Sequence, residues 1–279
     1  MDFPVNAPSE LEYFGALVQS DTQFPLLEAA ICVGLVASPE LQTQQVQDDC
    51  DQLLARLKCR LAADASAMHR LRLLNQYFFE ELGFSCTLND FDDPHNCCIH
   101  AVLSNRRGDP IALALIWLEL AHGLGLDAQG LALPGHFMVR VNLPHALVVM
   151  DMASGRSQSP EDLSELLEPF RDLHDGSGDD LHRLLQSTSS RGIIALLLRK
   201  LQDNFRVRLD WVGVIAVLNR LLVLLPDAVD VYRDRGLAYA ALGKATQAVQ
   251  DLERYLAHAQ LAQDAGVVSE CIADLRRMS

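Results

Sequence analysis

The stretch Arg107-Gly108-Asp109-Pro110 stands before a long apolar run, and two segments follow: Pro134-Gly135-His136-Phe137-Met138-Val139-Arg140 and Val148-Val149-Met150-Asp151. Asp109 suits a helix N-cap and Pro110 the first helical position, which predicts a helix over residues 110–123. Strands are expected at 137–141 and 146–150. A thiol at such a helix start would have a lowered pKa, with His136 as its base and Asp151 as the group that orients the base. Pro110 occupies that position, so the layout of a Cys-His-Asp site lacks its nucleophile.

Composition limits the function classes. The chain has 279 residues, 49% of them apolar, and a net charge of −14. Nucleic acids and anionic membrane surfaces are excluded as partners, because binding them needs clustered Lys and Arg. The seven cysteines show no disulfide spacing, and the N-terminus shows no secretory signal. The most apolar windows, residues 110–126 and 211–225, are interrupted by polar residues, so no membrane span is expected. We therefore expect a cytoplasmic protein.

The first part of the chain indicates helices that cover a central apolar helix. Apolar positions repeat at helical spacing over residues 24–36, 46–61 and 68–78. An irregular loop, rich in Asp and Asn, follows and leads to a short helix at 99–103. A helix is predicted to begin at Ser159-Pro160-Glu161 and to end near Pro169. The polar, Gly- and Ser-rich segment 171–191 is the expected domain boundary.

The C-terminal part follows the tetratricopeptide pattern. Tyr232, Arg235, Gly236 and Tyr239 are followed by small and large apolar residues at the repeat positions. About 34 residues earlier, the repeat length, Phe205 stands in a degenerate copy of the pattern. Because two repeats and a final helix (264–277) are too few to stand alone, we expect them to dock on the first domain. The expected partner-binding groove is formed by Phe205, Tyr232, Arg235 and Tyr239, although a purely stabilising role is equally open.

Together these motifs resemble the bacterial SirB family. The resemblance rests on the following segments: Phe24-Pro25-Leu26-Leu27-Glu28-Ala29-Ala30, Gly83-Phe84, Asp93-Pro94-His95-Asn96, Arg106-Arg107-Gly108-Asp109-Pro110-Ile111 and Pro134-Gly135-His136-Phe137. It implies an α+β fold, with a mostly helical papain/transglutaminase-like domain at residues 1–175 and an all-α tetratricopeptide-like domain at 191–279. Within the wider transglutaminase-like superfamily, the resemblance also implies a nucleophilic cysteine at or beside Pro110, a base at His136 and an acid at Asp151. The chain departs from its relatives after Asp151, where Pro-Phe-Asn-Gly-Gly is expected and residues 152–156 differ.

Several side chains are candidates for a degenerate pocket. We place Asn96, Arg107, His136 and Asp151 there, with His136 and Asp151 as a hydrogen-bonded relic pair. Arg106 and Arg107 could bind a substrate anion near the helix N-terminus, but pairing with Asp92, Asp93 or Asp151 is the favoured expectation.

The run His95-Asn96-Cys97-Cys98-Ile99-His100 holds four potential metal ligands. They are packed too closely for a tetrahedral site, so no metal and no cofactor is expected. Buried, apolar-like cysteines are the favoured interpretation of Cys97 and Cys98.

Three hypotheses for the function remain open. The leading one is a non-enzymatic, protein-binding regulator, a pseudoenzyme with a degenerate pocket. The alternative is a cysteine-type amidase, protease or other acyl-transfer enzyme that uses His136, Asp151 and an unidentified nucleophile. In the third, the pocket binds nothing and the protein is a purely structural regulator.

Overall fold

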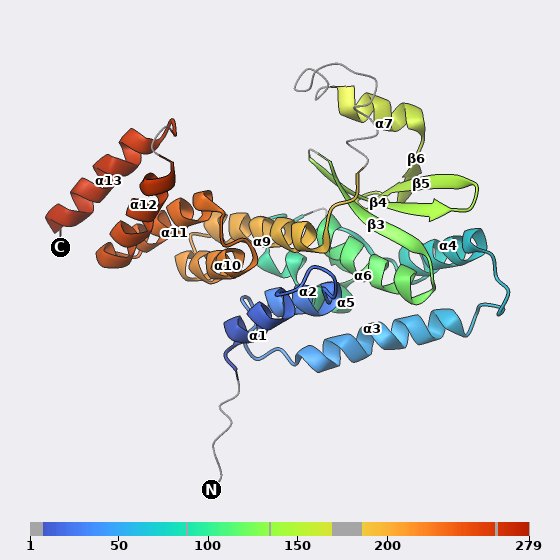
Figure 1. The fold of residues 1–279 in the computed structure, drawn as a ribbon. Coiled ribbons are helices and arrows are strands. Elements are labelled where there is room, and N and C mark those ends of the chain that lie inside the picture. The colour runs from blue at the N-terminus through green and yellow to red at the C-terminus, as the bar shows by residue number, and fades with distance from the viewer. Residues whose placement is uncertain (1–7, 88, 134, 169–185, 260–261, 279) are drawn as a thin grey trace, which may run out of the picture.

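The structure is a computed structural model that describes residues 8–87, 89–133, 135–168, 186–259 and 262–278. It has a mixed α+β N-terminal part with an antiparallel sheet, followed by helical hairpins that extend away from it to the C-terminus (Figure 1). The predicted fold class is therefore confirmed.

The helices of the N-terminal part are α1 (Glu10–Leu17), α2 (Leu26–Gly34), α3 (Thr43–Lys58), α4 (Ala67–Asn75), the π-helix η1 (Gln76–Glu81), the 3-10 helix η2 (Pro94–Cys97), α5 (Ile99–Asn105), α6 (Pro110–Gly123) and α7 (Pro160–Leu167). The C-terminal helices are α9 (Ser190–Val207), α10 (Trp211–Leu224), α11 (Val229–Ala241), α12 (Ala245–His258) and α13 (Ala265–Met278). The strands are β1 (Ser85–Cys86), β2 (Arg107–Gly108), β3 (Asp127–Leu133), β4 (His136–Leu143), β5 (Ala146–Asp151) and β6 (Arg156–Gln158).

The main sheet has the order β3-β4-β5-β6, and each neighbouring pair is antiparallel. Because side chains alternate along a strand, the sheet has two apolar faces. Phe137, Val139 and Val141 of β4 belong to the cluster that contains α6. Met138 belongs instead to a small cluster that includes Leu163 of α7. The sheet therefore lies between α6 and α7, as Figure 1 shows.

Helix α6 is the centre of the N-terminal part, and its bounds agree with the predicted ones. The Asp109 side chain caps it by accepting a hydrogen bond from the Ile111 N–H at 2.9 Å. Pro110 at the first helical position loses no hydrogen bond, because that amide has no intrahelical partner. The helix is apolar around most of its circumference, and Trp117 at its middle is fully buried. It is therefore a core element enclosed by its neighbours.

One hydrophobic core joins the two parts of the chain. A single cluster of buried residues runs from Phe14 to Ala238 and includes the inner faces of α9 and α10. A second cluster is formed by α11, α12 and α13. The predicted docking of the C-terminal helices is therefore observed, and it uses α9 and α10. Residues 171–185 of the expected boundary segment lie outside the described residues, and the division at 175 and 191 stays a proposal.

Small residues set the spacing of the helical hairpins, as the repeat pattern predicted. A Cβ atom on Gly236 of α11 would lie 2.7 Å from the Leu252 side chain of α12. Real Cβ atoms do not approach other atoms so closely, so the two helices pack at a distance that only glycine permits.

Within the described ranges, no helix combines the length and the apolar character that crossing a bilayer requires.

Candidate functional site

The start of α6 is fixed by the loop before it. The backbone N–H of Asp109 donates to the carbonyl of Asn96 at 2.8 Å. A Cβ atom on Gly108 would lie 2.5 Å from Val102 and 3.1 Å from that same carbonyl. Glycine at this position lets strand β2 pass close to α5 and η2, and it thereby sets where the Asp109 side chain lies.

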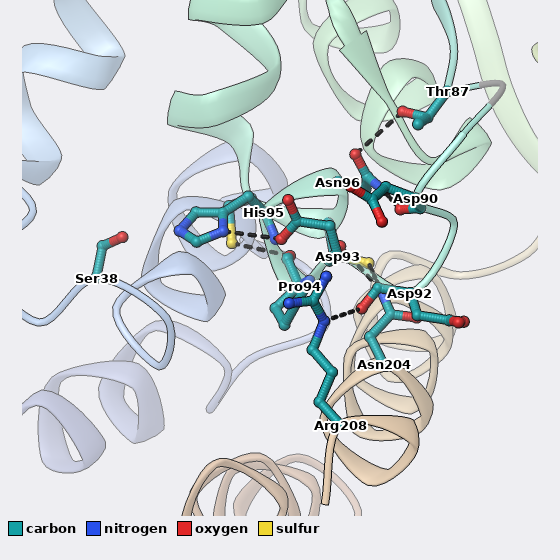
Figure 2. A network of polar contacts seen from close by, with 12 residues as sticks. Ser38, Thr87, Asp90, Asp92, Asp93, Pro94, His95, Asn96, Asn204 and Arg208 are labelled. Atoms are coloured by element: carbon teal, nitrogen blue, oxygen red, sulfur yellow. Dashed lines mark hydrogen bonds and ion pairs between the residues drawn. The ribbon is translucent and has the colours of Figure 1, made fainter. Parts of the chain in front are cut away.

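The loop itself is held by α9 (Figure 2). Asn204 donates from Nδ2 to the carbonyl of Asp93 at 3.2 Å, and Arg208 donates from Nε to the carbonyl of Asp92 at 2.9 Å. The Asn96 side chain accepts from the Thr87 hydroxyl at 3.0 Å and donates to the Asp90 carbonyl at 2.8 Å. Asn96 therefore stabilises the loop that carries the helix start. Its expected role as a pocket residue stays a prediction.

A hollow of about 310 Å³ opens at the start of α6. Three elements supply its walls, and we call it the α6 hollow. Its lining residues are Asp109, Pro110 and Ile111 of the helix start, Ala132, Leu133, Gly135, His136 and Phe137 of the β3–β4 hairpin, and Leu196 and Lys200 of α9.

Two charged groups face this largely apolar space. Burial raises the pKa of Asp109 above its ordinary value, while its hydrogen bond from Ile111 and the nearby Lys200 ammonium oppose the rise. In the part of the chain that the structure describes, Asp109 and Lys200 form no ion pair. The hollow therefore presents a carboxylate and an ammonium that are not neutralised by direct contact.

His136 and Asp151 lie on the same face of the sheet. Asp151 is directly opposite Met138, so His136, two residues earlier on β4, is its diagonal neighbour. The Asp151 carboxylate is bound within its own turn, where it accepts from the Ser154 hydroxyl at 2.7 Å and the Ala153 N–H at 3.0 Å. Among the described residues the expected hydrogen bond between His136 and Asp151 is not formed, and the carboxylate is held by donors of the β5–β6 turn.

Contrary to expectation, the two arginines before α6 do not pair with any carboxylate of the described residues. Arg107 donates to the carbonyls of Gly83 and Arg106, at 2.6 and 2.9 Å. Arg106 has a φ of 58°, which turns the chain at the end of α5, and its guanidinium lies over the Phe84 ring. That turn directs both side chains to the segment 83–84, away from the acidic loop. The pocket role of Arg107 stays a prediction.

The cysteines near the helix start are buried or half-buried thiols. Cys97 and Cys98 are fully buried, as predicted, and burial raises the pKa of both thiols, that of Cys98 to about 12. Cys86 is half-buried and lies opposite Gly108 in the β1–β2 pair. Burial first, and the carboxylates of Asp109 and Asp151 second, raise its pKa also. Among the described residues, no cysteine sulfur makes a hydrogen bond with the His136 ring, and no three ligating side chains gather as a metal site would require.

The four residues predicted to form a partner groove lie mostly between helices. Phe205 and Tyr232 are 6% and 9% exposed. Arg235 is bound to Asp251 through two hydrogen bonds of 2.6 and 2.8 Å, and Tyr239 is half-buried. Their burial gives these side chains a packing role in the helical hairpins, which differs from the exposed groove that the sequence suggested. Contact with a partner through them stays a prediction.

A sequence profile of the transglutaminase-like superfamily matches residues 44–199 of the chain. The chain belongs to the transglutaminase-like superfamily. A tetratricopeptide-repeat profile matches residues 205–273, so the predicted combination of the two regions is confirmed. The tetratricopeptide match suggests protein binding in general.

The transglutaminase-like chain is similar along most of its length to bacterial proteins named UPF0162, the SirB-type family that the sequence suggested. One from Xylella fastidiosa is 31% identical over 239 residues, which cover 85% of this chain and 84% of the relative. One from Pseudomonas aeruginosa is 29% identical, with 83% of each chain covered. The protein YchA of Escherichia coli is 22% identical, with 86% of this chain and 90% of YchA covered. No solved structure matches the chain significantly.

Sequence reasoning missed the contribution of α9 to this transglutaminase-like site. Leu196 and Lys200 are four residues apart and therefore share one helix face, which lies against the hollow. Their spacing was visible in the sequence. Nothing in it indicated that this face packs beside the start of α6, more than 70 residues earlier, because α9 was assigned to a separate domain.

Proposed function

We propose that the chain is a non-enzymatic, cytoplasmic regulator that binds a segment of another protein in the α6 hollow. One observation carries the proposal: the start of α6, where a thiol would be activated, is occupied by the capping pair Asp109-Pro110. Proline offers no nucleophile, and acyl transfer needs one.

The lining residues of the hollow favour a pocket that binds a ligand over a pocket that binds nothing. Leu133, Phe137 and Leu196 provide apolar surface, and Asp109 and Lys200 add polar groups at defined places. Ligand sites combine these features: apolar lining supplies affinity and a few polar groups fix orientation. The tetratricopeptide region supports a protein as the partner, because repeats of this kind suggest protein binding in general.

An acyl-transfer enzyme remains the second candidate, because His136 and Asp151 occupy one sheet face and Cys86 lies beside the helix start. Its weakness is the raised pKa of the Cys86 thiol, since the thiolate is the reactive form.

The test is a selection of twelve-residue peptides from a random display library on the full-length chain, with affinities measured by calorimetry. Leu196→Asp places a charge on the apolar wall and should abolish binding. Leu147→Asp, at an exposed leucine of β5 outside the hollow, is the matched control and should leave binding intact. Circular dichroism would check that both variants fold.

Treatment with iodoacetamide separates the two functions. Peptide binding should survive alkylation of the accessible thiols, whereas a cysteine enzyme would lose turnover of a fluorescent casein substrate. Thiol-dependent turnover that also disappears in His136→Ala would overturn the proposal in favour of the enzyme. A wild-type chain that selects no peptide would support an inert pocket.

A further inference from the structure

Asp109 has one carboxylate oxygen available to a ligand. Its Oδ1 accepts the capping hydrogen bond from Ile111. In the described part of the chain, Oδ2 accepts no hydrogen bond from any side chain or backbone amide. A carboxylate accepts several hydrogen bonds, and the partial burial of Asp109 limits how many of them water can supply. The second oxygen is therefore an acceptor without a donor on the wall of the α6 hollow.

Lys200 is a hydrogen-bond donor without an acceptor among the residues that the structure describes. Its ammonium donates up to three hydrogen bonds, yet within the described residues it has no hydrogen-bond or ion-pair partner. It lines the same hollow from α9, half-buried beside Leu196. Its charge opposes the rise in the pKa of Asp109, and the two groups line the same hollow without forming an ion pair in the described part of the chain.

The edge of β3 points to a ligand in extended conformation. The chain's own Thr188 lies along this edge: its N–H donates to the Gly130 carbonyl at 2.9 Å, and its hydroxyl accepts from the Ala132 N–H at 2.9 Å. The N–H and carbonyl of one strand residue point to the same side. The Ala132 carbonyl is therefore directed away from β4, and Ala132 also lines the hollow.

We infer that the α6 hollow binds an extended peptide whose backbone amide is held between Asp109 and Lys200, the peptide N–H donating to the carboxylate and its carbonyl accepting from the ammonium. One apolar side chain of the peptide packs on Leu196 and Phe137, and the Ala132 carbonyl accepts from a neighbouring peptide N–H. This inference rests on the proposed function and names the chemistry of its ligand.

An amide satisfies both groups, and a charged ligand does not. A free carboxylate would pair with Lys200 but would be repelled by Asp109. A protonated amine would pair with Asp109 but would be repelled by Lys200. An amide carries a donor and an acceptor but no net charge, so it is repelled by neither Asp109 nor Lys200. A ligand without an amide binds more weakly, because it leaves Asp109 or Lys200 without a hydrogen-bond partner, and this difference gives the specificity.

The experiment measures affinities of a selected, C-terminally amidated peptide for variants of the full chain. Asp109→Asn keeps the helix cap but replaces the free acceptor by a donor, and Lys200→Met keeps the length of the side chain without its charge. Each should weaken binding about tenfold or more, the loss typical of a hydrogen bond to a charged group. Asp210→Asn, at the equivalent cap of α10, and Lys244→Met, at an exposed lysine outside the hollow, are the matched controls and should bind as the wild type.

A series of peptides methylated at one backbone nitrogen each identifies the N–H that Asp109 holds. Methylation at one position should weaken binding to the wild type, and it should cause no further loss in Asp109→Asn. If Asp109→Asn and Lys200→Met both bind like the wild type while Leu196→Asp fails, the amide contact is refuted and the proposed function stands. Binding that requires a free C-terminal carboxylate would also refute it. If no peptide is selected at all, the proposed function and this inference fall together.

Discussion

Gly213 of α10 controls how closely α9 and α10 approach. A Cβ atom at this position would lie 2.7, 2.8 and 2.9 Å from three ring atoms of Phe205. The ring belongs to the main core and is 6% exposed, so it has little space in which to move aside. We therefore predict that Gly213→Ala destabilises the protein, although alanine is the better helix former.

The magnitude follows from two opposing effects. Forcing a methyl group into a packed core costs about 1–3 kcal/mol. The gain in helix propensity from glycine to alanine is at most about 1 kcal/mol. The expected net loss is about 1 kcal/mol. Gly15→Ala in α1 is the matched control, because its Cβ would meet Val223 at an ordinary 3.4 Å. That variant should gain about 0.5–1 kcal/mol.

Urea unfolding followed by tryptophan fluorescence measures both variants. The chain has two tryptophans, Trp117 and Trp211, and both belong to or pack against the core that contains Phe205. A Phe205→Leu background should reduce the cost of Gly213→Ala, because the leucine side chain lacks the ring atoms in contact. A Gly213→Ala variant as stable as Gly15→Ala, with an unchanged slope in urea, would refute the packing explanation.

Three further predictions concern the buried polar groups and the cysteines. Asn204→Ala should cost about 0.5–1.5 kcal/mol in urea unfolding, because it removes one of the two hydrogen bonds to the Asp93 carbonyl and leaves the one from the Asn96 N–H; a neutral result would mean that the Asn204 side chain does not hold the loop. Burial raises the pKa of Asp109, so the folded state binds that proton more tightly and loses stability as pH rises from below about 4, the ordinary aspartate pKa. Melting temperatures of Asp109→Asn should therefore rise relative to the wild type between that pH and 7, and a constant difference would contradict this sign. Iodoacetamide mapping by mass spectrometry should find the exposed Cys59 modified in the native chain, and Cys98, whose pKa burial raises to about 12, modified only after unfolding.

Local sequence predicted the elements whose boundaries have local chemical causes. The bounds of α6 were predicted because an aspartate cap, a proline and a terminal glycine mark a buried helix on both sides. The sequence also predicted β4 and β5, since β-branched residues alternate with others along β4 and stand side by side at Val148-Val149 in β5. By contrast, β3 was missed. Its sequence, Asp-Ala-Gln-Gly-Leu-Ala-Leu, has no β-branched residue and contains a glycine, so it shows no strand propensity.

The candidate site was predictable only where its residues are close in sequence. The helix start and the β4 histidine were identified from motifs, but Lys200 was not, because its place depends on tertiary packing of α9. The same limitation explains Asp151: its position on the sheet followed from the strand, whereas its hydrogen bonds depend on Ser154 and the turn that the chain makes there.

The shared core of α9 and α10 limits how this gene could be rearranged in evolution. These two helices contribute apolar side chains to the core around α6, so a recombination break before Ser190 would expose that surface in both products. A break after α10 would remove the buried residues Val231 and Ala238 of α11 from that core, whereas α12 and α13 pack with α11 in the second cluster. We expect duplication or loss of hairpins to be tolerated at the C-terminal end, while the first pair of helices is inherited together with the sheet.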